Sequence, residues 1–280
     1  MAELQVLLTG ISFGEQPRWH EDRLWFSDWG TREVIAVDLG GNQEVIVEAP
    51  AFPCCVDWLP DGRLLVVSGQ QGLLLRRELD GSMVTHCDVS GLSDPPAGNE
   101  LVVASRGNAY VNGGQVLGEE SATGIVAMVS PDGAARQVAD RLAFPNGMLI
   151  MPDDHTLIVA ESYANRLTAF DIAADGSLSN RRTWAELGDG VPDGICADAE
   201  NAVWYADVPN KRCVRVREGG EVLQVIELDR GCFACALGGP DRTTLFIIAT
   251  EWNGPQGMFQ GPRTGQVITT PVAAPGAGRP

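Results

Sequence analysis

The pattern of apolar and polar positions repeats at intervals of 40 to 47 residues along the chain. Each repeat contains a short apolar run, a polar turn rich in Pro, Asp and Gly, and a second apolar run. The segment 148–151, its turn at 152–156 and the run at 157–159 are a clear copy. Short apolar runs separated by such turns are typical of paired β-strands. We therefore predict a chain made almost entirely of strands.

Six copies of the repeat are present, and one residue marks the start of each. The successive marks are 40, 44, 47, 47 and 42 residues apart, which is the length of a propeller blade. The marks are Glu15, Cys55, Asn99, Asn146, Asp193 and Cys235. We predict an all-β, six-bladed β-propeller with four strands per blade, in which strands at 4–8 and 265–269 pair to close the terminal blade.

The composition is consistent with this fold and with one domain. Thirty-three glycines and 17 prolines supply turns, and no window has an apolar stripe at helical spacing. The repeat leaves no room for a linker, so we expect residues 1–280 to form a single propeller domain. We expect 271–280 to be a loose tail.

The net charge of −17 limits the partners of this protein. Nucleic acids and anionic membranes bind basic surfaces, so we expect neither as a partner, and no protein partner is evident. A small molecule is the expected ligand. No apolar run approaches the roughly 18 residues that span a bilayer, no leader is apparent, and seven cysteines suit a reducing compartment. We expect a cytoplasmic protein.

Glu15, Asn146 and Asp193 carry side-chain oxygens and each opens a similar strand-like segment. The first residues of equivalent inner strands meet around one mouth of a propeller channel, so Glu15, Asn146 and Asp193 should converge there. Two carboxylates and an amide carbonyl are hard ligands that suit Ca²⁺, Mg²⁺ or Mn²⁺, and zinc also accepts them. The alternative is that Asn146-Gly147 and Asp193-Gly194 are ordinary turn dipeptides and Glu15 is a surface acid.

Several motifs resemble the senescence-marker-protein, gluconolactonase and luciferin-regenerating enzyme family. They are Gly14-Glu15-Gln16-Pro17-Arg18-Trp19, Pro60-Asp61-Gly62-Arg63-Leu64, Phe144-Pro145-Asn146-Gly147, Pro192-Asp193-Gly194 and the segment 235–241. The resemblance covers nearly the whole chain.

The resemblance implies a six-bladed propeller that holds one divalent metal ion, most often calcium, through Glu15, Asn146 and Asp193. It implies hydrolysis of lactones or related esters, with Asn99 beside the metal and Asp193 as the catalytic base. A carboxylate that binds a cation is a poor base, so the nucleophile can instead be a metal-activated water that Asp193 orients.

The chain departs from the sugar-lactonase pattern before Asn99. The resemblance implies an arginine at this position in family members that act on aldonolactones, whereas this chain has Ala97. Phe13, Phe144, Val191 and Phe233 each lie two residues before a marked residue, and Phe52 lies three before one, so these side chains should share one side of the channel mouth. We expect an apolar wall and a substrate less polar than an aldonolactone; the alternative is that these rings only pack the tops of the blades.

Other parts of the site are less well defined by sequence. By resemblance, Glu119 or Glu120 is a candidate substrate contact, and Phe144 and Phe233 are candidates from their spacing. Pro95-Pro96 and 253–259 are candidate lid loops. The thiols of Cys55 and Cys235 are expected to face the channel, where they are either apolar packing groups or metal or redox groups.

Two other functions use the same predicted site. A phosphotriester hydrolase would bind a phosphoryl oxygen to the same hard cation, and apolar walls suit that substrate equally well. A propeller that binds calcium without catalysis, for stability or to present a surface to a partner, is the non-enzymatic alternative.

Overall fold

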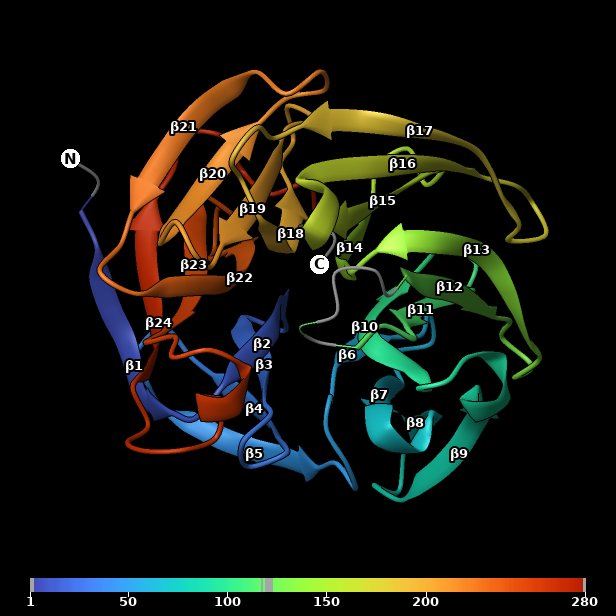
Figure 1. The fold of residues 1–280 in the computed structure, drawn as a ribbon. Helices are drawn as coiled ribbons and strands as arrows, with labels where there is room; N and C mark the ends of the chain where they lie inside the picture. Colours follow the sequence, from blue (N-terminus) through green and yellow to red (C-terminus); the bar gives the residue numbers. More distant parts are fainter. Residues whose placement is uncertain (1–2, 117, 119–122, 279–280) are drawn as a thin grey trace.

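The computed structural model describes residues 3–116, 118 and 123–278. Its strands form six four-stranded antiparallel sheets arranged in a ring around a channel (Figure 1). The predicted six-bladed β-propeller is confirmed. Helical structure in the described chain is confined to single 3₁₀ turns, η1 (Gly69–Gln71), η2 (Ser90–Leu92), η3 (Ser162–Ala164) and η4 (Pro255–Gly257). None of the helical segments described is long or apolar enough to cross a membrane.

Each blade runs from an inner strand beside the channel to an outer strand at the rim (Figure 1). The first blade contains β2 (Gly14–His20), β3 (Arg23–Asp28), β4 (Glu33–Val37) and β5 (Gln43–Glu48). The second contains β6 (Val56–Trp58), β7 (Leu64–Ser68), β8 (Leu73–Arg77) and β9 (Met83–Asp88). The third contains β10 (Ala97–Val103), β11 (Ala109–Gly113), β12 (Thr123–Val129) and β13 (Ala135–Ala143).

The remaining three blades follow the same order. The fourth contains β14 (Pro145–Ile150), β15 (Thr156–Glu161), β16 (Arg166–Ile172) and β17 (Leu178–Glu186). The fifth contains β18 (Pro192–Ala197), β19 (Val203–Asp207), β20 (Arg212–Val216) and β21 (Val222–Glu227). The sixth contains β22 (Gly231–Gly238), β23 (Thr244–Thr250), β24 (Gly265–Pro271) and β1 (Gln5–Ile11).

The sixth blade closes the ring with strands from both ends of the chain. Strand β1 pairs antiparallel with β24, with Gln5 opposite Thr269 and Val6 opposite Ile268. This is the closure predicted from the segments 4–8 and 265–269. It joins the first and last repeats, so the channel is lined on all sides by inner strands.

Several turns between strands contain an Asp-Gly pair in which the Asp side chain accepts a backbone hydrogen bond. Asp61 Oδ1 accepts the Arg63 N–H at 3.1 Å, and Asp175 Oδ1 accepts the Ser177 N–H at 3.0 Å. The glycines that follow these acids, Gly62 and Gly176, have φ values of 84° and 79°, which a side chain would disfavour. These turns explain why Asp and Gly punctuate the apolar runs at regular intervals.

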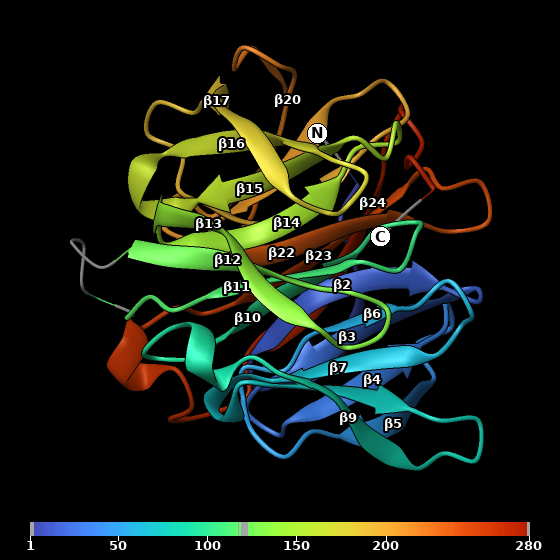
Figure 2. The same cartoon turned by 90° about the vertical axis from the view of Figure 1, so that its right-hand side faces the viewer.

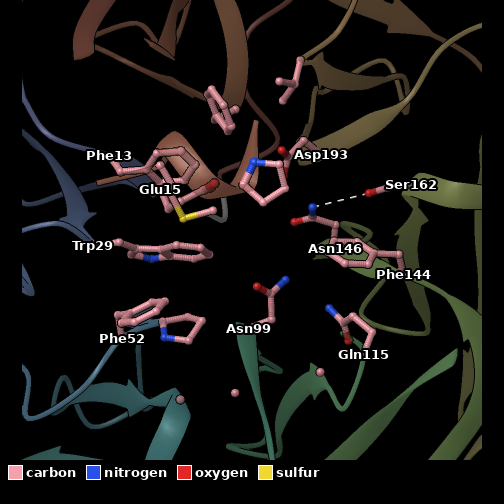
Figure 3. A pocket seen from close by; sticks show the side chains of 18 of the residues that line it. Phe13, Glu15, Trp29, Phe52, Asn99, Gln115, Phe144, Asn146, Ser162 and Asp193 are labelled. Carbon is pink, nitrogen blue, oxygen red and sulfur yellow. Dashed lines mark hydrogen bonds between the residues drawn. The ribbon is translucent and has the colours of Figure 1, made fainter. Parts of the chain in front are cut away.

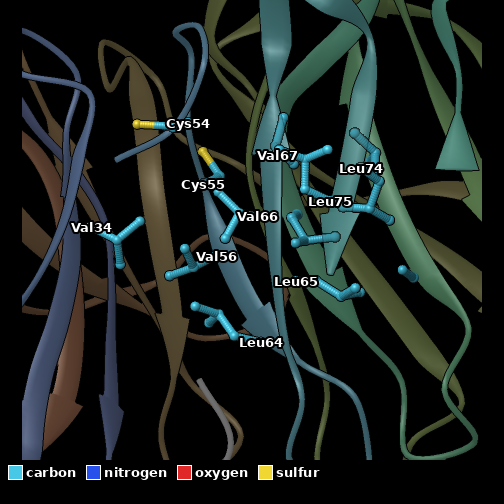
Figure 4. Close-up of a cluster of buried hydrophobic side chains, with 14 of the residues drawn as sticks. Val34, Cys54, Cys55, Val56, Leu64, Leu65, Val66, Val67, Leu74 and Leu75 are labelled. Carbon is cyan, nitrogen blue, oxygen red and sulfur yellow. The ribbon is translucent and has the colours of Figure 1, made fainter. Parts of the chain in front are cut away.

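The apolar core lies between neighbouring blades. Figure 4 shows Val34 of the first blade facing Val56 and the β7 side chains of the second, and Val34, Val56 and Leu65 are all fully buried. Burying one such side chain contributes about 1.5–3 kcal/mol. Because both faces of each inner strand are packed, these strands form a rigid support for the residues at the channel mouth.

The end of the chain is held by hydrogen bonds, and the prediction of a loose tail is wrong for its described part. The Ala199 N–H donates to Pro275 O at 2.8 Å, the Gly276 N–H donates to Arg242 O at 2.8 Å, and the Ala277 N–H donates to Ala197 O at 3.2 Å. These partners belong to the β18–β19 and β22–β23 connections. The tail therefore links the fifth and sixth blades (Figure 2).

Candidate active site

A cavity of about 480 Å³ opens where the inner strands begin. Glu15 of β2, Asn99 of β10, Asn146 of β14 and Asp193 of β18 all line it. Figure 3 shows their side chains turned toward a common centre from separate blades. The structure thus brings together the four polar residues that the repeat pattern selected.

The inner strands are irregular at these residues. Register shifts interrupt the pairing of each inner strand with its neighbour between Glu15 and Arg18, Ala97 and Glu100, Pro145 and Met148, and Pro192 and Ile195. A β-bulge re-aims side chains that regular pleating would direct into the sheet faces. The repeated bulges are the local reason why these blades present a polar side chain to the channel.

The Asn-Gly and Asp-Gly pairs lie inside strands, so the alternative that they are turn dipeptides is wrong. Asn146-Gly147 is in β14 and Asp193-Gly194 is in β18. A Cβ atom on Gly147 would lie 2.4 Å from Asp193 O, and one on Gly194 would lie 2.5 Å from Ala234 Cβ. Glycine is required because the inner strands of adjacent blades approach closely, not because the chain turns.

Two carboxylate oxygens in the cavity wall lack a hydrogen-bond partner. Glu15 Oε2 and Asp193 Oδ1 are both buried and unpartnered, and their residues are only 3% and 9% exposed. Buried polar atoms are nearly always satisfied, so an unpaired carboxylate oxygen indicates a missing ligand. Among the described residues no three His, Cys, Asp or Glu side chains form a metal-binding group, so a third protein ligand has to be an amide or backbone oxygen.

Asn146 is oriented to supply that oxygen. Its Nδ2 donates to Ser162 Oγ at 3.4 Å, and Ser162 Oγ in turn donates to Pro192 O at 2.7 Å. With the amide nitrogen held in this way, the amide oxygen faces the centre of the cavity (Figure 3). Glu15, Asn146 and Asp193 therefore fit a hard divalent cation.

A buried charge cluster lies beneath these residues. Glu100 and Arg18 are 2% and 3% exposed, and Arg18 Nη2 donates to Leu101 O at 3.0 Å. Burial raises the pKa of Glu100 to about 7, although Arg18 and a hydrogen bond with Gln16 lower it. With all groups ionised, three carboxylates face one guanidinium, which leaves two negative charges for a cation of charge +2 to neutralise.

The same environment raises the pKa of both candidate ligands. Burial, then the charges of Asp193 and Glu100, raise the pKa of Glu15 well above its ordinary value. Burial and the charge of Glu100 likewise raise the pKa of Asp193, and a hydrogen bond from Asn146 opposes this. Without a cation, the site favours protonated carboxyls over a concentrated negative charge.

These shifts predict that stabilisation by calcium grows with pH. Because the folded pKa values lie above those of the unfolded chain, metal-free protein loses stability as pH rises above about 4. A cation needs both carboxylates ionised, so the gain in Tm on adding calcium should increase as pH rises above about 4. Thermal unfolding of chelator-stripped, dialysed protein with and without calcium measures this gain. A gain that is constant with pH contradicts the assignment of Glu15 and Asp193.

Ser162 is predicted to set calcium affinity without touching the ion. Replacing Ser162 by Ala removes the hydroxyl that holds the Asn146 amide and joins it to the strand of Asp193. Loss of such a supporting group typically weakens metal binding by about 10–100-fold. Calorimetric titration with calcium gives the Kd, and Ser130→Ala, an exposed turn serine, is the matched control. Equal Kd values for Ser162→Ala and the parent protein rule out this role.

The predicted apolar residues Phe13, Phe52, Phe144, Val191 and Phe233 all line the cavity. Phe144 lies apart from the others, stacked on Tyr163 with ring centroids 4.5 Å apart. Ala97 is fully buried, so no arginine side chain projects from that position.

Sequence reasoning missed a second set of lining residues. Trp29, Gly69, Ser162 and Val208 each follow directly the second strand of a blade, where that strand returns to the cavity. Each of these residues follows the second apolar run of its repeat. That position predicts a cavity residue only when the antiparallel pairing of the two runs is known, because the pairing returns the chain to the end where the inner strand begins. Gln115 and Tyr163 also line the cavity and were not predicted, whereas Met258, in the candidate lid segment 253–259, and Trp252, directly before it, were expected to cover a pocket.

The remaining predicted residues have different outcomes. Neither Cys55 nor Cys235 belongs to the cavity lining, so the prediction that their thiols face the site is wrong. The Cys55 thiol donates to Asn99 O at 2.6 Å, and Cys235 packs 3.8 Å from the Cys196 sulfur between blades. Burial raises the pKa of both thiols, which makes them unreactive packing groups. Glu119 and Glu120 lie outside the described residues.

The candidate lid segments both reach the cavity. Pro95 and Pro96 line it from the connection between β9 and β10, and Pro255 and Met258 line it from the connection between β23 and β24. The second segment contains η4 and lies beside the aromatic side of the cavity.

The family model described as the SMP-30/Gluconolactonase/LRE-like region matches residues 13–251. The chain belongs to this family. The match contains all four polar residues of the cavity.

Individual relatives are distant. Regucalcin from Bos taurus is 26% identical over 94% of this chain and 92% of its own. Regucalcin from Xenopus laevis is 32% identical, but that match spans only 42% of each chain.

Solved structures agree over nearly the full length. A gluconolactonase from Xanthomonas campestris is 25% identical with a TM-score of 0.75, covering 97% of this chain and 90% of that one. A calcium-binding regucalcin from Agrobacterium tumefaciens has a TM-score of 0.82 at 20% identity, covering 100% and 97%. The latter establishes likeness of fold alone. Membership of a gluconolactonase-like family suggests lactone hydrolysis.

Proposed function

We propose that the protein is a divalent-metal-dependent hydrolase of lactones or related carboxylic esters, with calcium as the expected ion. The observation that carries this proposal is the pair of buried, unpartnered oxygens of Glu15 and Asp193 at an otherwise largely apolar cavity. Membership of the gluconolactonase-like family supports the reaction class. The excess negative charge around Glu100 and Arg18 supports an ion of charge +2.

The residues of this site have distinct proposed roles. A bound divalent cation supplies a Lewis acid for the acyl oxygen and lowers the pKa of water. Glu15, Asn146 and Asp193 hold it, and Asn99 contacts the substrate or an ordered water. Asp193 orients the attacking water and is the proposed group to accept its proton. Because binding a cation weakens a carboxylate as a base, orientation is the larger part of this role.

We propose a substrate less polar than an aldonolactone. Ala97 is buried and offers no donor for sugar hydroxyls, and Phe13, Phe144 and Phe233 line the space where those hydroxyls would lie. Hydroxyl groups placed against these aromatic rings would lose hydrogen bonds to water without replacing them. An alkyl or aryl substituent has no hydroxyl groups and would lose none.

Hydrolysis of a lactone panel tests the proposal. Chelated protein is assayed on aldono-1,4- and 1,5-lactones and on alkyl-substituted lactones, with and without calcium, magnesium, manganese or zinc. Metal-dependent hydrolysis that favours the substituted lactones is the expected result. Preference for aldonolactones overturns the assignment of substrate polarity, and no hydrolysis with any metal overturns the lactonase proposal.

Two alternatives share this site. A hard cation held by Glu15, Asn146 and Asp193 would suit a phosphoryl oxygen as well as an acyl oxygen, so phosphotriesters belong in the same panel. If calcium changes stability but none of the lactones, esters and phosphotriesters is hydrolysed, a non-catalytic calcium-binding propeller becomes the better description.

A further inference from the structure

The cavity has two chemically different sides. Figure 3 shows Phe13, Trp29 and Phe52 on one side and Asn99, Gln115 and Asn146 on the other. The aromatic side, here called the aromatic wall, comes from the first and sixth blades, the β5–β6 connection and the β23–β24 connection. Its members are Phe13, Trp29, Phe52, Phe233, Trp252 and Phe259.

Phe13 organises the inner part of this wall. Its ring is stacked on Trp29 at 5.6 Å and meets Phe233 edge-on at 4.6 Å. All three side chains are buried, and Trp29 Nε1 donates to Cys54 O at 2.8 Å, which fixes the indole. The inner part of the aromatic wall is therefore preformed and rigid.

The aromatic rings in the outer part of the wall are partly exposed. Phe259 is 43% exposed, yet it meets Phe52 at 5.0 Å and Phe13 at 6.1 Å, both nearly perpendicular. Trp252 meets Phe13 at 6.0 Å and Phe233 at 5.4 Å. Rings that served only to fill the core would be packed on all sides, whereas Trp252 lines the open cavity and Phe259 packs on Phe13 and Phe52, which also line it.

We propose that the aromatic wall binds a planar aryl group of the substrate, while the acyl group lies over Glu15, Asn146 and Asp193. This rests on the proposed hydrolase function and specifies its substrate class as aryl-substituted lactones or aryl esters. Aromatic rings placed edge-on and face-on to a ligand ring interact through their quadrupoles, beyond the apolar area they bury. A saturated ring of the same size gains only the free energy of burying its apolar surface.

The β23–β24 connection supplies the selective part of this wall. Trp252, Met258 and Phe259 all lie between the end of β23 and the start of β24, outside any strand. The Met258 side chain lines the cavity, and thioethers make favourable contacts with aromatic rings. Changes in this connection can alter the substituent that is accepted without altering the carboxylates.

A matched pair of substrates tests the proposal. We would compare kcat/KM of calcium-loaded protein for γ-phenyl- and γ-cyclohexyl-butyrolactone, which differ in aromaticity and little in size. We expect a phenyl preference of about tenfold, equivalent to one to three ring contacts. Phe259→Leu and Trp252→Leu should each reduce this ratio toward one. Trp58→Leu, which alters an aromatic side chain outside the cavity, should leave the ratio unchanged.

A binding measurement separates this proposal from the hydrolase proposal. The corresponding γ-phenyl and γ-cyclohexyl lactams resist hydrolysis, and their Kd values can be measured by calorimetry. Tighter binding of the phenyl lactam, lost in Phe259→Leu, supports the aryl site even if no lactone is hydrolysed. Equal hydrolysis of both lactones by all variants overturns the aryl site and leaves the hydrolase standing. Absence of binding by both lactams overturns it as well.

Discussion

Replacing Asp193 by Asn is expected to reduce kcat/KM for the best lactone by about 10²–10⁴-fold, the range associated with loss of a positioned acid or base. The change removes one of the two carboxylates that have an unpartnered oxygen, and with it the group that orients water, but it keeps the size of the side chain. Because Asp193 carries a raised pKa in the metal-free protein, its neutral replacement should not lower the Tm of that form. Steady-state kinetics and thermal unfolding measure both quantities.

Metal content distinguishes the two roles of Asp193. If excess calcium restores the rate of Asp193→Asn, the residue acts only as a ligand. If the rate stays low in protein shown to be calcium-loaded, Asp193 also acts on water. Asp61→Asn, in a surface turn, is the control and should retain full activity. Full activity of Asp193→Asn without added metal excludes this residue from the mechanism.

Replacing Gly147 by Ala is expected to abolish tight calcium binding and to destabilise the fold by about 1–3 kcal/mol. The new methyl group would lie 2.4 Å from Asp193 O and 2.7 Å from Ile195 N, and both are backbone atoms that no rotamer change can move. The fourth and fifth blades would have to separate at the point where they hold Asn146 and Asp193. Calcium titration and chemical denaturation measure the two effects.

Gly91 provides the matched control for this substitution. It is exposed, and a Cβ atom there has open space and no left-handed backbone to strain. Gly91→Ala should leave both calcium affinity and stability within about 0.5 kcal/mol of the parent. If Gly147→Ala behaves like Gly91→Ala, then the close approach of β14 and β18 does not set the geometry of the site.

The repeat pattern predicted the fold because strand order follows chain order in a propeller. Within each blade, neighbouring strands are also consecutive in sequence, and only the β1–β24 pair joins distant segments. Local turn chemistry at positions such as Asp61-Gly62 was therefore sufficient to place the blades. The same regularity brought Glu15, Asn146 and Asp193 to one mouth.

The register within a strand was harder to predict. Cys235 was treated as equivalent to Asp193, but β22 begins four residues before Cys235, whereas β18 begins one residue before Asp193. Phe233 is the residue of β22 that reaches the cavity. Residues at equivalent positions of two repeats do not reach the same level of the channel when the inner strands differ in length and in the position of the β-bulge.

Cavity residues in loops and buried charged residues were hard to predict from the sequence. Trp252 and Met258 were expected to cover a pocket with the candidate lid segment 253–259, but Gln115, which also lines the cavity, lies in a connection without a repeat pattern. Glu100 and Arg18 read as the polar residues of alternating strands, and only the structure reveals that both are buried beneath the site. Their partnership depends on packing between the first and third blades, which no local pattern encodes.

The hydrogen-bonded end of the chain has a practical consequence for handling the protein. Residues 275–277 are held by the β18–β19 and β22–β23 connections, at the opposite ends of the inner strands from Asp193 and Phe233. That face is remote from the mouth through which a substrate enters (Figure 2). An immobilised catalyst should therefore be tethered there, for example through Glu200→Cys, so that every molecule presents its entrance to the flowing solution.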